Sequence, residues 1–237
     1  MCVKYTNMKR FLISICIILY TLPVYSLSSY SATYNLHLLT NLGPIKLGIA
    51  EYELILANQA YIFKSFAKTD LIWRAMYDYR VDETSVGLIK DKLLIGNYYK
   101  INEKKAGSLG EDYEINIYPV ERYATMNNET KWYANSSNLV DALSIYLNIS
   151  KDIQKDLNKK VLSYQLVDKK GINQREFNVV GRETITIDSK EFETIRIECS
   201  ELKLIINISM DHNFMPINIE KTNGTSQFRL RLKDFKV

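Results

Sequence analysis

Hydrophobic and polar residues alternate along most of the chain, and this alternation predicts β-strands. Apolar residues recur at every second position through most of 31–39 (SATYNLHLL), 45–56 (IKLGIAEYELIL), 202–208 (LKLIINI) and 228–233 (FRLRLK), so each segment can bury one face. Turn-forming residues separate such segments about every 8–12 residues, as in antiparallel sandwiches and barrels. The pattern therefore predicts a mainly β fold, either a curved antiparallel sheet or a half-open β-barrel.

The most regular part of this pattern lies at the C-terminal end. Asn223-Gly224 is a strong signal for a two-residue hairpin turn or its bulged relative, and strict alternation follows it. We expect the apolar residues of 228–232 to face the core, with Arg229 and Arg231 on the outer face.

One segment, residues 137–147 (SNLVDALSIYL), has helical spacing instead. Its apolar residues form a single stripe, Ser137 or Asn138 can cap it, and Asp141 falls in its first turn. The spacing predicts one central helix, packed against the concave face of the sheet or in the mouth of the barrel. We expect the stripe to line a groove for an apolar ligand through Leu139, Leu143, Tyr146 and Leu147.

Residues 1–26 have the pattern of a secretory signal peptide. Three basic residues, Lys4, Lys9 and Arg10, come before the apolar run 11–22 (FLISICIILYTL), and the segment holds no acidic residue. We predict cleavage after Ser26, with cleavage after Ser31 and a start at Met8 as alternatives. The run is shorter than the roughly 20 residues that span a bilayer, and no later segment has such a run. We therefore expect a single β-rich periplasmic domain, residues 27–237, with no membrane span after cleavage.

Removal of this segment changes the charge and the cysteine count. It carries three of the 31 basic residues and none of the 27 acidic ones, so the net charge falls from +4 to about +1. A nearly neutral domain gives no reason to expect nucleic acid as a partner. Cys199 alone remains, so no intramolecular disulfide can form, and its alternation with Ile195 and Ile197 predicts a buried thiol.

The sequence contains no motif for catalysis, metal binding or cofactor binding. CxxC, HExxH, GxSxG and GxGxxG are all absent. His37 is expected in a strand, on the face opposite Leu36, and Asp211-His212 is expected in a turn, where turn polarity explains it more simply than catalysis. We therefore predict no catalytic residues, no metal and no cofactor, and a protein that is not an enzyme.

Aromatic residues concentrate in the middle third of the chain, at Tyr98-Tyr99, Tyr113, Tyr118, Tyr123 and Trp132-Tyr133. Tyrosine and tryptophan combine apolar area with a polar group, so this set indicates either a wall that faces a ligand or the ordinary core and rim of a barrel.

Four segments resemble the DUF3108 family of exported bacterial proteins. They are Leu47-Gly48-Ile49-Ala50 after Tyr34, the Asp-x-Leu-Ser pattern within 140–147, Val179-Val180-Gly181-Arg182-Glu183, and the turn 211–217 with Asp211 and Pro216. The resemblance implies a periplasmic, half-open barrel with no established activity, and it offers no catalytic residues.

These observations favour an exported, non-catalytic protein of the cell envelope that binds an apolar or lipid-like ligand or a protein partner. The alternatives are a structural or interaction module that acts through an exposed sheet edge, and a periplasmic hydrolase.

Overall fold

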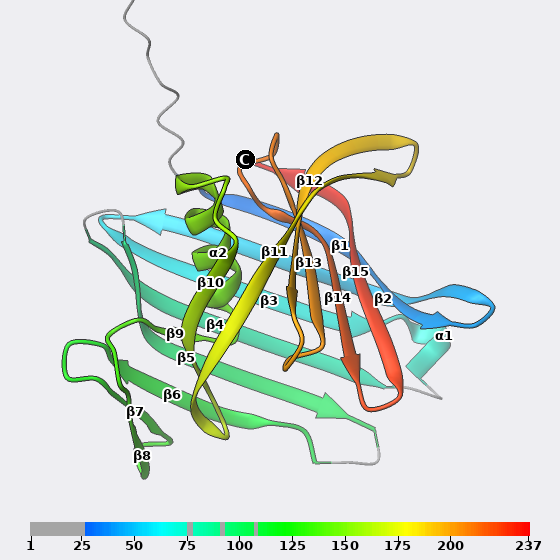
Figure 1. Ribbon diagram of the computed structural model, residues 1–237. Coiled ribbons are helices and arrows are strands. Elements are labelled where there is room, and N and C mark those ends of the chain that lie inside the picture. The colour runs from blue at the N-terminus through cyan, green and yellow to red at the C-terminus, as the bar shows by residue number, and fades with distance from the viewer. Residues whose placement is uncertain (1–26, 75–77, 91–92, 107–108) are drawn as a thin grey trace, which may run out of the picture.

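The computed structural model describes residues 27–74, 78–90, 93–106 and 109–237. The predicted signal peptide lies outside the described residues, so its cleavage stays a prediction. All fifteen described strands belong to one sheet (Figure 1). The chain order of the strands largely determines their order in this sheet, because neighbouring strands are joined by short turns.

The first half of the sheet is an antiparallel meander of eight strands. They are β1 (Tyr30–Thr40), β2 (Gly43–Ala57), β3 (Ala60–Thr69), β4 (Tyr79–Lys90), β5 (Leu93–Lys105), β6 (Asp112–Tyr118), β7 (Tyr123–Met126) and β8 (Thr130–Tyr133), and the short helix α1 (Leu71–Arg74) follows β3. Each pairs with the next. Asn58 and Gln59, both with positive φ, make the tight turn between β2 and β3.

The second half is built by the remaining strands and one longer helix. They are β9 (Leu139–Asp141), α2 (Ser144–Lys155), β10 (Val161–Asp168), β11 (Gly171–Ile187), β12 (Lys190–Cys199), β13 (Leu204–Ser209), β14 (Pro216–Asn223) and β15 (Ser226–Lys236). β9 pairs with β10 in parallel, and the other pairs are antiparallel. β15 pairs with β1, so the blue and red strands of Figure 1 join the two halves.

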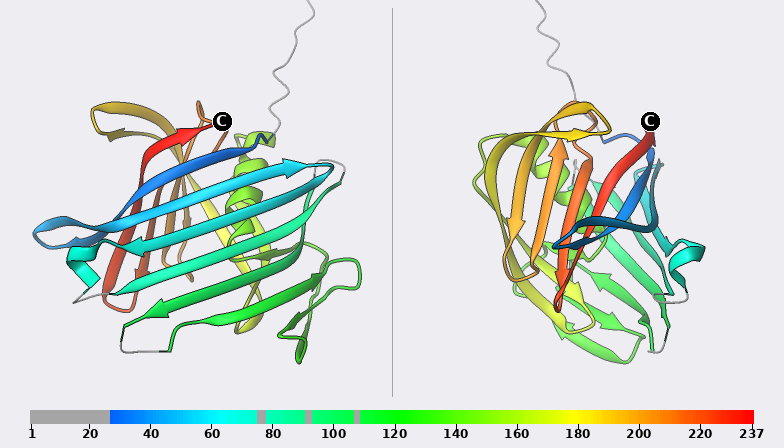
Figure 2. Two further views of the ribbon diagram at one scale, coloured as in Figure 1. Left: turned by 180° about the vertical axis from the view of Figure 1, so that it is seen from behind. Right: turned by 90° about the vertical axis from the view of Figure 1, so that its right-hand side faces the viewer.

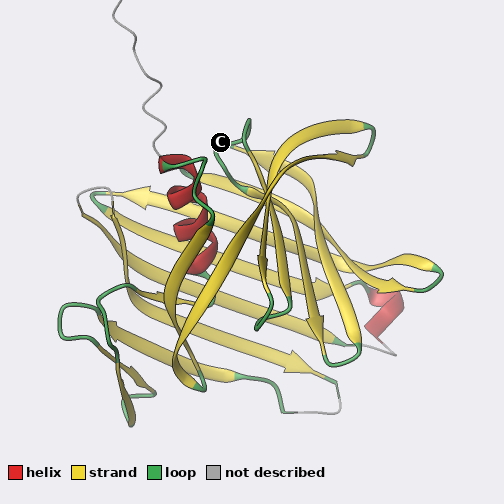
Figure 3. Cartoon of the chain, viewed as in Figure 1, coloured by secondary structure: helices red, strands yellow, loops and turns green. Residues whose placement is uncertain are grey.

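The sheet folds over so that its two halves face one another (Figure 2), and α2 lies between them (Figure 3). The sheet order ends at β8 on one side and β9 on the other, so it does not close into a complete barrel. The predicted fold class is confirmed: the chain is mainly β, with a curved, half-open sheet and one central helix packed against it.

The core lies on the concave face of the sheet. Side chains alternate between the two faces of each strand, so every second residue points into this core. In β2, Ala50, Tyr52 and Leu54 are buried while Glu51 and Glu53 between them are exposed. The same alternation buries Cys199, as predicted. The rows of inward side chains from both halves meet those of α2 in one continuous cluster.

The predicted helix boundaries are wrong. Residues 139–141 form β9, and α2 runs from Ser144 to Lys155 rather than over 137–147. Hydrogen bonding explains the shift, because Gln165 N donates to Asn138 O and holds this segment extended beside β10. The Asp141 carboxylate then accepts from the amides of Leu143 and Ser144 at 2.9 and 2.8 Å. Asp141 therefore caps the helix from before its start instead of lying in its first turn.

The C-terminal hairpin forms with its turn one position later than expected. Asn223 pairs with Ser226, so Gly224 and Thr225 are the turn residues, and Gly224 has a φ of +60°. Leu230 and Leu232 face the core, as predicted. The strict alternation of this strand fixes its facing, because a slip of one residue would turn every side chain over.

Candidate functional site

The structure brings the four residues of the predicted groove together, but it packs three of them tightly. Leu139, Leu143 and Leu147 are 3%, 1% and 2% exposed, and only Tyr146 is partly accessible. The leucines therefore hold β9 and α2 against the sheet. Tyr146 marks the part of this set that a ligand could reach without displacing the helix.

Tyr146 belongs to a group of tyrosines on the concave face, which we call the tyrosine cluster: Tyr34, Tyr52, Tyr99, Tyr113 and Tyr146. The Tyr146 ring centroid lies 6.1 Å from that of Tyr52, which lies 5.1 Å from that of Tyr34. On the other side, the centroids of Tyr99 and Tyr113 are 6.1 Å apart. These separations are typical of interacting aromatic pairs.

Glu83 links the two parts of the tyrosine cluster. It projects from β4 on the same face as the buried Val81 and Ser85, and the Tyr99 hydroxyl donates to its Oε1 at 2.6 Å. Burial raises the pKa of Tyr146, and the Glu83 charge raises it further. Burial is also the main cause that raises the pKa of Tyr113, and Glu83 is among the charges that add to it.

The Glu83 carboxyl itself is shielded but not sealed. Burial raises its pKa, whereas the hydrogen bond from Tyr99 and the charge of Lys221 act in the opposite direction. The side chain nevertheless remains partly accessible. Glu83 is thus an acceptor in aromatic surroundings that a ligand could approach.

A second carboxyl on this face, Asp141, is fully buried and fully engaged. Its Oδ2 accepts from the hydroxyls of Ser85 and Ser144, both at 2.7 Å, in addition to the two amides at the start of α2. Burial raises the pKa of Asp141, and these hydrogen bonds oppose that rise. Because both oxygens are occupied by partners from β4 and α2, Asp141 fixes the helix to the sheet and offers nothing to a ligand.

The histidines lie away from the tyrosine cluster. His37 alternates with the buried Leu36 in β1, so it lies on the opposite, convex face, as its strand position predicts. His212 Nδ1 lies 2.9 Å from Ser209 Oγ, and its ring packs between Phe192 and Phe235 at centroid distances of 5.3 and 4.9 Å. Ser209 is fully buried, so this pair closes the turn between β13 and β14, as the simpler interpretation of that segment expected.

Metal binding has no obvious place in the described part of the chain. There, no group of three or more His, Cys, Asp or Glu residues is arranged to hold an ion.

The predicted aromatic wall is split between two faces. Tyr99 and Tyr113 join the tyrosine cluster, whereas Tyr118 stacks on Tyr123 at 4.4 Å on the β6–β8 side, with Tyr133 nearby. Sequence reasoning missed Tyr34 and Tyr52 as site residues because an inward tyrosine in an alternating strand has the pattern of ordinary core.

Glu83 was also missed, and the polar run around it is the reason. Asp82, Glu83 and Thr84 are consecutive, so hydropathy alone does not show which of them faces inwards. The spacing Val81, Glu83, Ser85 on a two-residue period is the signal that could have identified it.

Comparison with known proteins identifies the fold but no family. No protein-family model matches the chain, and no curated protein sequence matches it either. The crystal structure of a β-barrel-like protein of the domain of unknown function DUF1849 from Brucella abortus is similar, with a TM-score of 0.55 and 14% identity over 89% of this chain and 98% of that one. The resemblance to DUF3108 is therefore wrong, because the structural neighbour carries a different domain and no family model supports that assignment. Within the described residues, no helix has the length and apolar character to cross a membrane.

Proposed function

We propose that this chain is an exported, non-catalytic binding protein of the cell envelope, whose ligand lies against the tyrosine cluster and Glu83. The observation that carries the proposal is the Glu83 carboxyl, which is partly accessible although burial raises its pKa. An acceptor in such surroundings favours a ligand that brings its own hydrogen-bond donor.

The chemistry of the face defines the class of ligand. Tyr146, whose ring packs on that of the buried Tyr52, presents ring surface next to the apolar core, so it suits an apolar body. Glu83 suits a polar head that donates a hydrogen bond. The positive charge of Lys221 lies near enough to lower the pKa of Glu83, which favours its charged form. A lipid-like molecule with a hydroxyl or amide head has both parts.

The proposal is tested by native mass spectrometry of the protein purified from an envelope extract without detergent. We expect an adduct that denaturing chromatography resolves as a lipid-like molecule. The variant Glu83→Gln keeps the shape of the side chain and an acceptor for Tyr99, but removes the charge, and we expect it to retain much less of the adduct.

The chain offers a matched control on the opposite face. The Tyr98 hydroxyl donates to the Glu114 carboxylate at 2.9 Å. This tyrosine–glutamate pair matches that of Tyr99 and Glu83 but lies outside the concave face. Glu114→Gln should carry the adduct at the wild-type level. Wild-type protein without any adduct, or equal loss in both variants, would contradict the proposed site.

A sheet edge supports a second candidate, an interaction module. β8 ends the sheet order, and Tyr133 on it is 73% exposed, so a strand of a partner could pair there. Tyr133→Asp should then abolish capture of the partner while leaving the adduct unchanged.

A further inference from the structure

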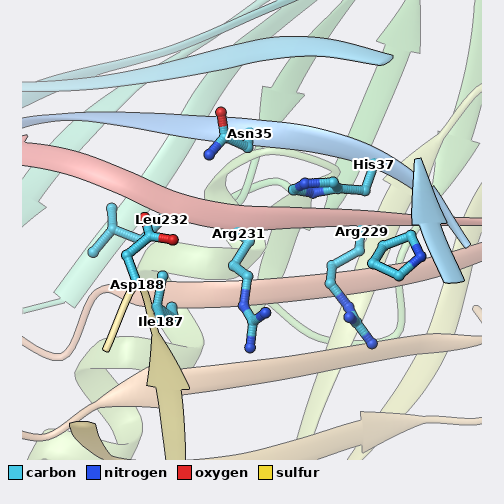
Figure 4. Close-up of a pocket in the computed structure, with 8 residues that line it drawn as sticks. Asn35, His37, Ile187, Asp188, Arg229, Arg231 and Leu232 are labelled. Atoms are coloured by element: carbon cyan, nitrogen blue, oxygen red, sulfur yellow. The ribbon is translucent and has the colours of Figure 1, made fainter. Parts of the chain in front are cut away.

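The convex face carries a small pocket that the proposed function does not use (Figure 4). It lies where β1 pairs with β15, and the tip of the β11–β12 hairpin borders it. Its volume is about 100 Å³, and its lining consists of Asn35, His37, Pro44, Ile187, Asp188, Arg229, Arg231 and Leu232. Since one water occupies about 30 Å³ of liquid, the pocket has room for one small polyatomic ion.

The two arginines of the pocket differ in their partners. Figure 4 shows them side by side on β15. Arg229 is neutralised, because its Nε and Nη2 both lie 2.9 Å from Oε1 of Glu220. Arg231 donates from Nη2 to the Thr186 carbonyl at 2.8 Å, and its Nε is buried without a hydrogen-bond partner. Arg231 therefore keeps a donor and its full charge for another partner.

Two more unpartnered atoms belong to β1, the strand that pairs with β15. Asn35 pairs with Arg231 across the strands and His37 pairs with Arg229, and Asn35 Oδ1 and His37 Nδ1 are also buried without a partner. Buried polar groups are rarely left unpaired. Three such atoms in one pocket indicate that something outside the chain satisfies them.

The charges around His37 show what kind of partner is missing. Burial lowers the pKa of His37, the positive charges of Arg229, Arg231 and Lys46 lower it further, and a hydrogen bond with the Asn35 backbone opposes them. Asp188 is the acidic residue in the lining, and it lies at the hairpin tip. The nearby positive charges therefore disfavour the protonated form of His37. A bound anion would offset these charges and favour that form.

We propose that this pocket binds a single small oxyanion, held by Arg231 and His37. A turn of the Arg231, His37 and Asn35 side chains towards the pocket lets Arg231 Nε–H, the protonated His37 Nδ1–H and the Asn35 amide donate to its oxygens. Asp188 opposes the anion and limits its affinity. The site is separate from the concave face, so neither site depends on the other.

The test follows His37 by NMR, with sulfate as the probe because its charge does not change in this pH range. The ring signals of His37 and His212 are titrated in sodium chloride and in sodium sulfate at equal ionic strength, and His212→Asn assigns them. If sulfate binds the protonated form about tenfold more tightly, the pKa of His37 rises by about one unit at saturation. His212 should show no difference between the salts.

Variants with opposite expected effects complete the test. Arg231→Gln should abolish the sulfate effect on His37, and Asp188→Asn should strengthen it, whereas Lys233→Gln, which removes an exposed charge from the same strand, should leave it unchanged. Acetate in place of sulfate distinguishes a carboxylate site from one for tetrahedral anions. A pKa of His37 that is the same in chloride, acetate and sulfate would overturn the proposal and leave water as the occupant. If Arg231→Gln does not fold, Asp188→Asn still tests the proposal, because it should enlarge the rise in the His37 pKa that sulfate causes.

Discussion

Replacing Asp141 would separate the two roles of this carboxylate, as an acceptor and as a buried charge. Asp141→Ala leaves the amides of Leu143 and Ser144 without their acceptor. The two serine hydroxyls can turn elsewhere, since Ser85 Oγ already lies 3.4 Å from the Tyr61 hydroxyl. An unsatisfied buried amide costs about 1–3 kcal/mol, so we expect the free energy of unfolding to fall by about 2–6 kcal/mol. That is a large part of the roughly 5–15 kcal/mol that holds a domain together.

Asp141→Asn should behave differently. Its carbonyl oxygen can accept from both amides, and its NH2 group can donate to the serine hydroxyls, which also act as acceptors. We expect a change below about 1.5 kcal/mol at neutral pH. Urea unfolding followed by circular dichroism measures both variants, with a constant m-value as the check that the unfolded state is unchanged.

The pH dependence of the comparison has a definite sign. Burial raises the pKa of Asp141 above its ordinary 3.8. A raised carboxyl pKa stabilises the fold at pH values below the unfolded pKa, and this contribution is lost as the pH rises through the folded pKa. Asp141→Asn should therefore gain stability relative to the wild type between pH 4 and pH 7. Equal losses for the alanine and asparagine variants would show that the charge, rather than the accepted hydrogen bonds, holds α2, and would refute the reasoning.

Three further predictions concern the helix stripe, the last hairpin and processing. Leu143→Ala should lower the free energy of unfolding by roughly 2–5 kcal/mol as a core truncation, and an unchanged melting temperature would mean that the stripe is not packed. Gly224→Ala should lower the free energy of unfolding by about 1 kcal/mol, because φ is +60° there. A Cβ would meet nothing within 4 Å, so only backbone strain contributes. A neutral result in urea unfolding would mean that the turn adjusts. The exported protein should begin at Leu27 or Ala32, and Edman sequencing of periplasmic protein that begins at Met1 or Met8 would contradict the predicted signal peptide.

Strand positions were predictable because their pattern and their environment agree. The alternation in β15 places Leu230 and Leu232 inwards without any knowledge of their neighbours. In β2 the phase changes at the irregularity opposite Gly48, so Ile45 is exposed and Tyr52 is buried instead. The same reasoning failed at the start of α2. An apolar stripe does not show whether Leu139 and Val140 belong to a helix or to a strand that pairs with a segment distant in sequence. That choice depends on β10, which follows later in the chain.

The candidate site was less predictable than the fold. The tyrosine cluster draws on β1, β2, β5, β6 and α2, and no local spacing connects these segments. Glu83 gains its character from burial among them, which arises only when the two halves of the sheet face each other. Local patterns identified Tyr146 and Tyr113 among the partly accessible residues of this face, but not Glu83.

The pairing of β1 with β15 has a consequence for the time course of folding. β1 forms one edge of the first meander until residues 226–236 are available. Contacts between segments so distant in sequence form slowly, because closing the long intervening loop loses conformational entropy before the contacts contribute any favourable free energy. During synthesis, the unpaired N–H and C=O groups of β1 are therefore exposed to strands of other chains. A chain truncated before β15 would keep that edge permanently open, and it should aggregate by lateral strand addition at concentrations where the complete protein stays dispersed.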